Sequence, residues 1–576
     1  MSTTWTKASP PTPGSLTSPA PIFNLADVIC RLKDDESLSQ QGLREMSSAL
    51  NKISCTLGSD PSLIPAEPAV LRSRLSKTTA AMAGVSQARW NNIKSLTLKA
   101  LKHVGLRSMP GRRREPLAPE WEVLRGALPD RHFQSGLSRF MSYCTAQGID
   151  PPAVTAETFV QFGKKVENFS LVRDPGGVFR DTCKLWNRAA HAFPEWPQLI
   201  VAVPNRRRDF ALVFDNFPPT FRADVEGFLS RGANPDVFSD SYHKPVAELT
   251  LRNRRQYILM AATALVRNGM PIERILGLDT LVSTTNAKSL LRILYERAGA
   301  ASNHQIFHIV TLLKTIARHH LKLPEKAVDQ LCKLCKALNP GTTGFTEKNR
   351  ECLRQFLDTR KLVNLLTLPN RVLDEVARRD KLRRRDAVRV EFAVATGILL
   401  NIPLRADNLA GLDLSRHLKF VGTHTLLIVP QEETKNDVPV EAEFPPRLVE
   451  QLDIYIQTYR PLLIQEPTPW LFPGENGARR PSGGFAQQLS AFIAKEVGVV
   501  ITAHQFRHLA AKLYLDRNPH DFETVRRLLG HKSIETTRRY YRELDSVLAG
   551  KRYAAMLDQL TADSEMPLTP HRPKRS

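Results

Sequence analysis

The stretch from Leu528 to Tyr540, LLGHKSIETTRRY, carries the clearest local signals in this sequence. Two leucines before a glycine are typical of a helix that ends in a left-handed residue, and such an end presents His531 at a turn. The Ser/Thr-rich segment after it suits the start of a new helix. Tyr540 follows His531 by nine residues in that new helix. The stretch therefore predicts two helices joined by a turn that carries a histidine.

A second motif, HQFRH at 504–508, lies a little upstream. Its residues His504 and Arg507 are three apart, so a helix places them on one face. A guanidinium group offers a planar fork of donors that fits two phosphate oxygens, and an imidazole beside it exchanges protons near neutral pH. The motif predicts a phosphate-binding helix face.

Two more pieces complete the pattern. LRADNL at 404–409 contributes Arg405, and ETKNDVP at 433–439 contributes Lys435. The second piece lies in a turn between β-rich runs. The runs are 418–421, 425–429 and 438–444. They predict a small antiparallel sheet in a C-terminal catalytic domain, and the rest of the chain has helical periodicity, so the expected fold class is mainly α.

These pieces define one candidate catalytic set. Its members are Arg405, Lys435, His504, Arg507, His531 and Tyr540. A tyrosine with its free pKa of about 10 is a poor nucleophile and needs cations or a base around it. Two arginines, a lysine and histidines supply that environment for phosphoryl transfer, with no metal or cofactor required. Each motif alone is common in proteins and more often has a structural role. The order and spacing of the motifs together favour a catalytic site.

Composition agrees with a polyanionic partner. The chain of 576 residues has 81 Lys+Arg against 58 Asp+Glu, a formal charge of +23. Such an excess favours nucleic acid binding, and the length requires several domains. Seven scattered cysteines indicate a reducing cytosol, and with no membrane-length apolar run the expected location is cytoplasmic and nucleoid-associated. Cys332 and Cys335 form a C-x-x-C, which we interpret as part of an amphipathic helix and not as half of a zinc site.

The order of the motifs resembles the catalytic domain of tyrosine recombinases, the phage integrase family. The motifs cover residues 345–550, and the helical block before them is similar to that family's core DNA-binding domain. The resemblance implies a site-specific recombinase or integrase that cleaves and rejoins DNA through a 3′-phosphotyrosine, for a mobile genetic element. It implies that Arg405 and Arg507 hold the scissile phosphate. It also implies that Lys435 protonates the leaving 5′ oxygen.

The same resemblance assigns the remaining roles. His504 would act as base toward the tyrosine, His531 would bond a non-bridging oxygen, and Tyr540 would form the covalent link. A C-shaped DNA clamp, double-stranded recombination sites as substrate, a homotetramer on synapsed DNA, and accessory DNA-bending or partner recombinase proteins are implied as well.

The expected parts follow from periodicity, linkers and the resemblance together. They are a disordered tail at 1–21, helical modules at 22–105 and 120–200, a core DNA-binding domain at 213–338, a catalytic domain at 341–560 and a basic tail at 561–576. Arginine clusters, among them Arg252, Arg254 and Arg255, are read as solvated helix faces, some of which contact phosphate.

Two departures from the family pattern stand out. Family members usually carry an acid three positions after the first arginine, where this chain has Asn408, with Asp407 one position earlier, and this leaves the orientation of Arg405 open. Tyr540 is followed by Tyr541, and because neighbouring helical residues point about 100° apart, only one of them faces a phosphate. Two other functions stay open at this point: a type IB topoisomerase with similar chemistry, and a DNA-binding protein with a decayed site.

Overall fold

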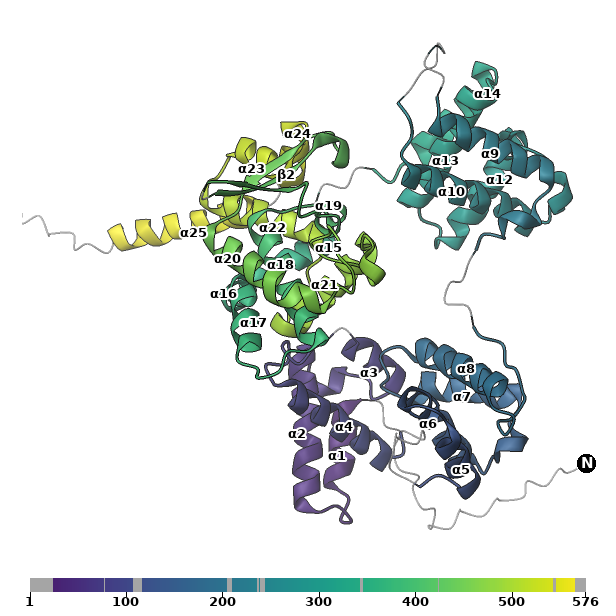
Figure 1. Ribbon diagram of the computed structural model, residues 1–576, viewed down its shortest axis with the longest axis vertical. Coiled ribbons are helices and arrows are strands. Elements are labelled where there is room, and N and C mark those ends of the chain that lie inside the picture. The colour runs from purple at the N-terminus through teal and green to yellow at the C-terminus, as the bar shows by residue number, and fades with distance from the viewer. Residues whose placement is uncertain are drawn as a thin grey trace, which may run out of the picture. The chain divides into compact units, whose positions relative to one another are not determined.

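The computed structural model describes most of the chain. The described residues are 24–76, 78–106, 116–204, 210–235, 238, 244–341, 345–422, 424–541 and 545–564. The predicted tail at 1–21, and the basic linkers around Arg113 and Arg207, lie outside them. The buried side chains form four hydrophobic cores, each of which is described by itself. Figure 1 shows the helices that carry them.

The first core belongs to a short helical module. Its helices are α1 (Leu25–Lys33), α2 (Gln40–Leu57), α3 (Pro68–Leu75) and α4 (Gln87–His103). Helix α1 begins with a capping box, in which the side chains of Asn24 and Asp27 each bond the other's backbone N–H. Such reciprocal caps satisfy backbone donors that have no partner within the helix. Leu50 and Trp90 are buried at the centre of this module.

The second module is built on aromatic side chains. Its helices are α5 (Pro119–Ala127), α6 (Arg131–Gln147), α7 (Ala156–Phe169) and α8 (Pro175–Ala192). The ring of Phe140 stacks on Phe159 at 4.2 Å between centroids and meets Trp186 edge-on at 5.4 Å. Such aromatic pairs add roughly 0.5–1.5 kcal/mol each beyond their buried area.

A separate compact unit spans Asn205–Gly344. Its main helices are α9 (Pro219–Ala233), α10 (Glu248–Arg267), α12 (Thr284–Arg297), α13 (His304–Thr315) and α14 (Glu325–Ala337). Helix α13 is continued by a π-helical turn, Ile316–His320. Helix α14 carries Cys332 and Cys335, and Cys335 is buried in the core, as the amphipathic interpretation predicts.

Arg252 on α10 is exposed, as the solvated-face interpretation predicts, whereas Arg254 and Arg255 are half-buried and differ from it. The guanidinium of Arg254 lies 5.8 Å from the ring centre of Phe228, and that of Arg255 lies 5.0 Å from Phe214. Arg255 also pairs with Glu226 on α9. These side chains therefore help to hold α9 and α10 together. The sequence could not show this, because the partner rings lie more than twenty residues away.

The C-terminal part surrounds one buried helix, α18 (Arg384–Asn401), which contacts α17 (Leu368–Ala377), α20 (Pro446–Ile454), α21 (Ser482–Val497) and α22 (Ala503–Arg517) (Figure 1). The remaining helices of this part are α15 (Glu347–Arg354), α16 (Thr359–Leu366), α19 (Ala406–Ala410), α23 (Phe522–Leu529), α24 (Ile534–Tyr541) and α25 (Asp545–Ser564). Helix α25 continues past residue 560, so the predicted basic tail begins inside a helix, and residues 565–576 lie outside the described part.

Three strands form the sheet of this part. They are β1 (Leu418–Val421), β2 (His424–Val429) and β3 (Val440–Glu443), antiparallel in the order β1-β2-β3. The register pairs Leu418 with Leu427 and Val429 with Val440. The predicted class, mainly α with a small antiparallel sheet, is confirmed. None of the described helices is long and apolar enough to cross a bilayer.

Candidate active site

Arg405 is positioned at the start of α19. Arg405 is the N-cap residue of α19. It directly follows a buried segment, Ile402–Leu404, which connects the end of α18 to α19. Partial burial lowers the pKa of the Arg405 guanidinium from its ordinary value. Helix α19 is held at its next turn by an ion pair between Asp407 and Arg479, with 3.1 Å between the carboxylate and the guanidinium nitrogen.

Arg507 is the most enclosed member of the candidate set. It lies on α22, and only 6 % of the residue is exposed. Its Nη1 donates to the carbonyl of Pro403 at 2.7 Å, and its Nη2 donates to the carbonyl of Leu529. Burial lowers its pKa to about 10, with Arg405 contributing further. The side chain therefore remains a cation at neutral pH. It links the segment that precedes α19 to the last residue of α23.

His531 lies in the turn that the sequence predicts. Gly530 caps α23 with φ of 56°, the left-handed region that favours glycine, and the next residue begins the turn. The ring Nδ1 lies 2.9 Å from the hydroxyl of Thr537, a fully buried residue of α24. Burial, and then Arg507 and Arg405, lower the pKa of His531 to about 4. The imidazole is therefore neutral at physiological pH.

Lys435 is exposed in the turn between β2 and β3. The neighbouring Thr434 is buried, and its hydroxyl donates to the carbonyl of Val438 at 2.9 Å and accepts from that residue's N–H at 3.0 Å. On the other side, the amide of Asn436 donates to the carbonyl of Gly530 at 3.4 Å. Hydrogen bonds between Thr434 and Val438 therefore close the β2–β3 turn, and the Asn436 contact places it beside the turn of His531.

His504 lies where these charges converge. Its side chain is exposed at the first turn of α22, one turn before Arg507. Partial desolvation lowers its pKa, and the positive charges of Arg507, Arg405 and Lys435 lower it further. The structure thus brings five of the six sequence-predicted residues into one electrostatic neighbourhood, on four elements that lie far apart in the chain.

The two adjacent tyrosines differ sharply. Tyr541 is 1 % exposed, and its hydroxyl lies 2.9 Å from Nδ1 of His508. Burial raises the pKa of Tyr541 above its ordinary value. Tyr540 is only partly buried, with the guanidinium of Arg539 5.4 Å from its ring centre. Within the described part of the chain, no hydrogen bond joins its hydroxyl to the other five candidates.

A relay of amides fixes the proton on His508. The Oε1 of Gln505 accepts from the N–H of Thr502 at 2.9 Å, so the Gln505 amide nitrogen is left to donate to Asn349. The Asn349 amide nitrogen in turn lies 3.1 Å from Nε2 of His508. A neutral imidazole that accepts at Nε2 carries its proton on Nδ1 and donates to Tyr541. Sequence reasoning missed this relay, because its members lie up to 159 residues apart.

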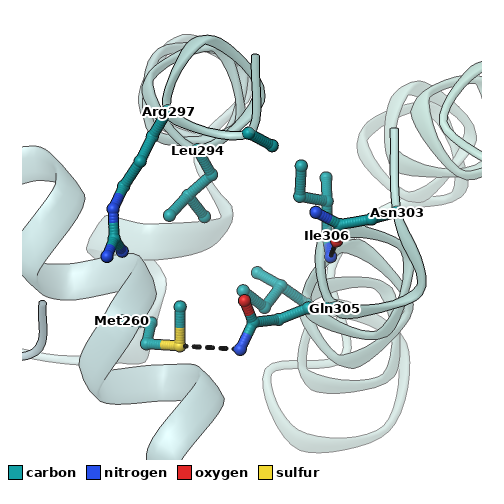
Figure 2. Close-up of a pocket in the computed structure, with 8 residues that line it drawn as sticks. Met260, Leu294, Arg297, Asn303, Gln305 and Ile306 are labelled. Carbon is teal, nitrogen blue, oxygen red and sulfur yellow. Dashed lines mark hydrogen bonds between the residues drawn. The ribbon is translucent and has the colours of Figure 1, made fainter. Parts of the chain in front are cut away.

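A hollow lies in the Asn205–Gly344 unit, between α10, α12 and α13. Figure 2 shows its polar lining of Arg297, Asn303 and Gln305 around Met260. Asn303 caps α13, and Gln305 donates to the sulfur of Met260 at 3.5 Å. The guanidinium of Arg297 lies 4.2 Å from the ring centre of Phe210. Because these groups are engaged within the fold, we assign no function to the hollow.

The comparisons with known proteins concern the part that holds the candidate site. Residues 356–546 match the model of the phage integrase family. All six candidate residues lie inside the matched segment. No curated protein matches the chain.

Solved structures also resemble the chain, with low identity. A XerH site-specific recombinase bound to a palindromic difH substrate has 14% identity and a TM-score of 0.32, over 57% of this chain and 96% of that one. A lambda integrase dimer bound to a COC′ core site has 15% identity and a TM-score of 0.34, over 54% and 95%. The Tn1549 transposon integrase with circular intermediate DNA has 18% identity and a TM-score of 0.31, over 51% and 90%.

Proposed function

We propose that this chain is a site-specific tyrosine recombinase or integrase of a mobile genetic element, which cleaves and rejoins DNA through a 3′-phosphotyrosine at Tyr540. The observation that carries the proposal is the convergence of Arg405, Lys435 and Arg507 on two neutral histidines, of which His531 bonds Thr537 on the helix of Tyr540. Cations of this density around two uncharged bases suit a group that carries negative charge and develops more during reaction.

Phosphate binding falls to the two arginines. A guanidinium has five N–H donors, and the two carbonyls bonded by Arg507 use only two of them. The remaining donors, with those of Arg405, would hold the non-bridging oxygens of a scissile phosphate. If Nδ1 of His531 accepts the Thr537 hydroxyl proton, its Nε2–H is left to donate to the same oxygens.

The proposed chemistry is a pair of transesterifications. His504, whose lowered pKa favours the neutral form, takes the proton from the Tyr540 hydroxyl. The phenolic oxygen then bonds to phosphorus while the bond to the 5′ oxygen breaks, and Lys435 supplies the proton that the leaving oxygen needs. Attack by the 5′ hydroxyl of a partner strand reverses these events, so the phosphodiester energy is kept throughout.

DNA contact and assembly extend the proposal beyond the site. The charge of +23 favours a duplex partner, and we propose that the Asn205–Gly344 unit also contacts the duplex. Helix α25 exposes an apolar stripe at Tyr553, Met556, Leu557 and Leu560. We propose that this stripe docks on a second copy of the chain in a DNA-bound tetramer, with accessory DNA-bending or partner recombinase proteins as further participants.

One experiment tests the proposed function directly. The full chain is incubated with labelled DNA fragments from both flanks of its gene, the reaction is stopped with denaturant, and covalent complexes are separated and the cleaved phosphate mapped. We expect a 3′-phosphotyrosine at one site, lost in Tyr540→Phe. Tyr541→Phe is the matched control and should keep it. The absence of any covalent complex would reject the proposal, and relaxation of plasmid DNA at no specific site would indicate a topoisomerase.

A further inference from the structure

Glu433 precedes Lys435 by two residues, and its carboxylate and its backbone carbonyl are bonded by two different parts of the chain. Its carboxylate accepts hydrogen bonds from Arg416 and from His417, the latter at 3.1 Å. Its backbone carbonyl accepts from the side-chain amide of Asn408 on α19 at 2.9 Å. One residue of the β2–β3 turn is therefore fixed at both ends.

The Glu433 carboxylate is bonded by a buried histidine in a loop that is itself held by hydrogen bonds. His417 is 2 % exposed, and its Nδ1 accepts the backbone N–H of Asp413 at 3.0 Å. A neutral imidazole in that state carries its proton on Nε2, the atom that faces Glu433. The Asp413 carboxylate accepts the N–H and the hydroxyl of Ser415 at 2.9 and 2.7 Å, which holds the loop before β1. A buried histidine in a tied loop has little freedom to move with Glu433.

The contact from α19 depends on the residue type at 408. A carbonyl oxygen accepts only, so the side chain opposite it must donate, which an asparagine amide does and an ionised carboxylate does not. Asn408 lies three residues after Arg405, on the same short helix. The Asn408 amide therefore forms a bond between the helix of Arg405 and the turn of Lys435.

We infer that Asn408, Glu433 and His417 form a network that positions Lys435. This inference rests on the proposed function. The network fixes the chain on the near side of Lys435, and the Asn436 contact to Gly530 fixes it on the far side. The backbone is thereby held while the lysine side chain stays exposed and free to reach a leaving oxygen. Asn408 touches no reacting atom and acts through Lys435.

The test separates proton delivery from every other step. On the DNA site mapped as above, the 5′-bridging oxygen of the scissile phosphate is replaced by sulfur. A thiolate with a pKa of about 8.5 leaves without a proton, whereas an alkoxide does not, so the sulfur substrate makes the general acid unnecessary. We expect Asn408→Ala to slow single-turnover cleavage of the oxygen substrate by about tenfold or more, as misplaced catalytic groups do. Cleavage of the sulfur substrate should stay at the wild-type rate.

Asn401→Ala is the matched control. Asn401 also donates its amide to a backbone carbonyl, that of Gly397 at 2.8 Å, but within α18. The Asn401→Ala variant should cleave both substrates at the wild-type rate. Equal loss on both substrates in Asn408→Ala, or loss on neither, would overturn the inference. Wild-type protein that forms no covalent complex with either substrate would reject the proposed function itself.

Discussion

The contrast between Tyr540 and Tyr541 gives the sharpest prediction. Replacing Tyr541 by Phe removes one hydroxyl and keeps the ring, whose centre lies 5.8 Å from that of His508 and 6.2 Å from that of Phe345. The hydroxyl is the acceptor of a buried His508 N–H, and the relay through Asn349 prevents that proton from moving to the other nitrogen. An unpaired buried donor costs roughly 1–3 kcal/mol. We therefore expect Tyr541→Phe to lower the free energy of unfolding by about that amount.

Tyr540→Phe should show the opposite pair of effects. Its hydroxyl has no hydrogen bond to the other candidates within the described part, so its removal should change the unfolding free energy by less than about 0.5 kcal/mol. It should nevertheless abolish covalent attachment to DNA, which Tyr541→Phe should retain. Urea unfolding followed by circular dichroism gives the first quantity, and denaturing gels of DNA complexes give the second. Attachment lost in Tyr541→Phe but kept in Tyr540→Phe would refute the reasoning.

Three other outcomes are expected. Burial lowers the pKa of His508 from 6.5 to about 3, so the unfolded state binds more protons below pH 6.5, and this histidine should contribute about 2 kcal/mol to a fall in the unfolding free energy between pH 7 and pH 5. His531, whose pKa is lowered to about 4, should add about as much, so His508→Gln should remove about 2 kcal/mol of the fall and leave the rest, and an unchanged slope in urea titrations would contradict the assignment. Gly530→Ala should cost about 1–2 kcal/mol through its positive φ, with no clash because only Val438 lies near, and wild-type stability would argue against the left-handed turn. Met556→Glu with Leu560→Glu should weaken DNA-bound self-association in sedimentation runs without slowing cleavage of a single site, and unchanged assembly would remove α25 from the interface.

The fold class and the secondary structure around the candidate site could be predicted from local signals. The leucine-glycine end of α23, the spacing of His504 and Arg507, and the β-rich runs around Lys435 each act over a few residues, so periodicity and capping rules identify them. The roles of these residues in catalysis remain predictions.

What could not be predicted depends on long-range contacts. The sequence around Asn408 or His417 does not identify Glu433 as the bonding partner. Glu433 lies 25 residues after Asn408 and 16 after His417, and its position depends on the folded sheet. The same holds for Asn349 and His508, which meet across 159 residues. Such bonds depend on where whole elements pack, and no property of a single segment encodes that position.

The two carbonyls held by Arg507 affect how this protein should be dissected. Alanine at 507 would remove a proposed phosphate ligand and also the side chain that bonds the carbonyls of both Pro403 and Leu529. Each stranded buried carbonyl costs about 1–3 kcal/mol, a sum comparable to a sizeable part of the stability of a domain. An inactive Arg507 variant would thus report unfolding and lost chemistry together. Lys435 is exposed and, among the residues that the structure describes, bonds no buried carbonyl, so a loss of rate after its substitution reports on chemistry.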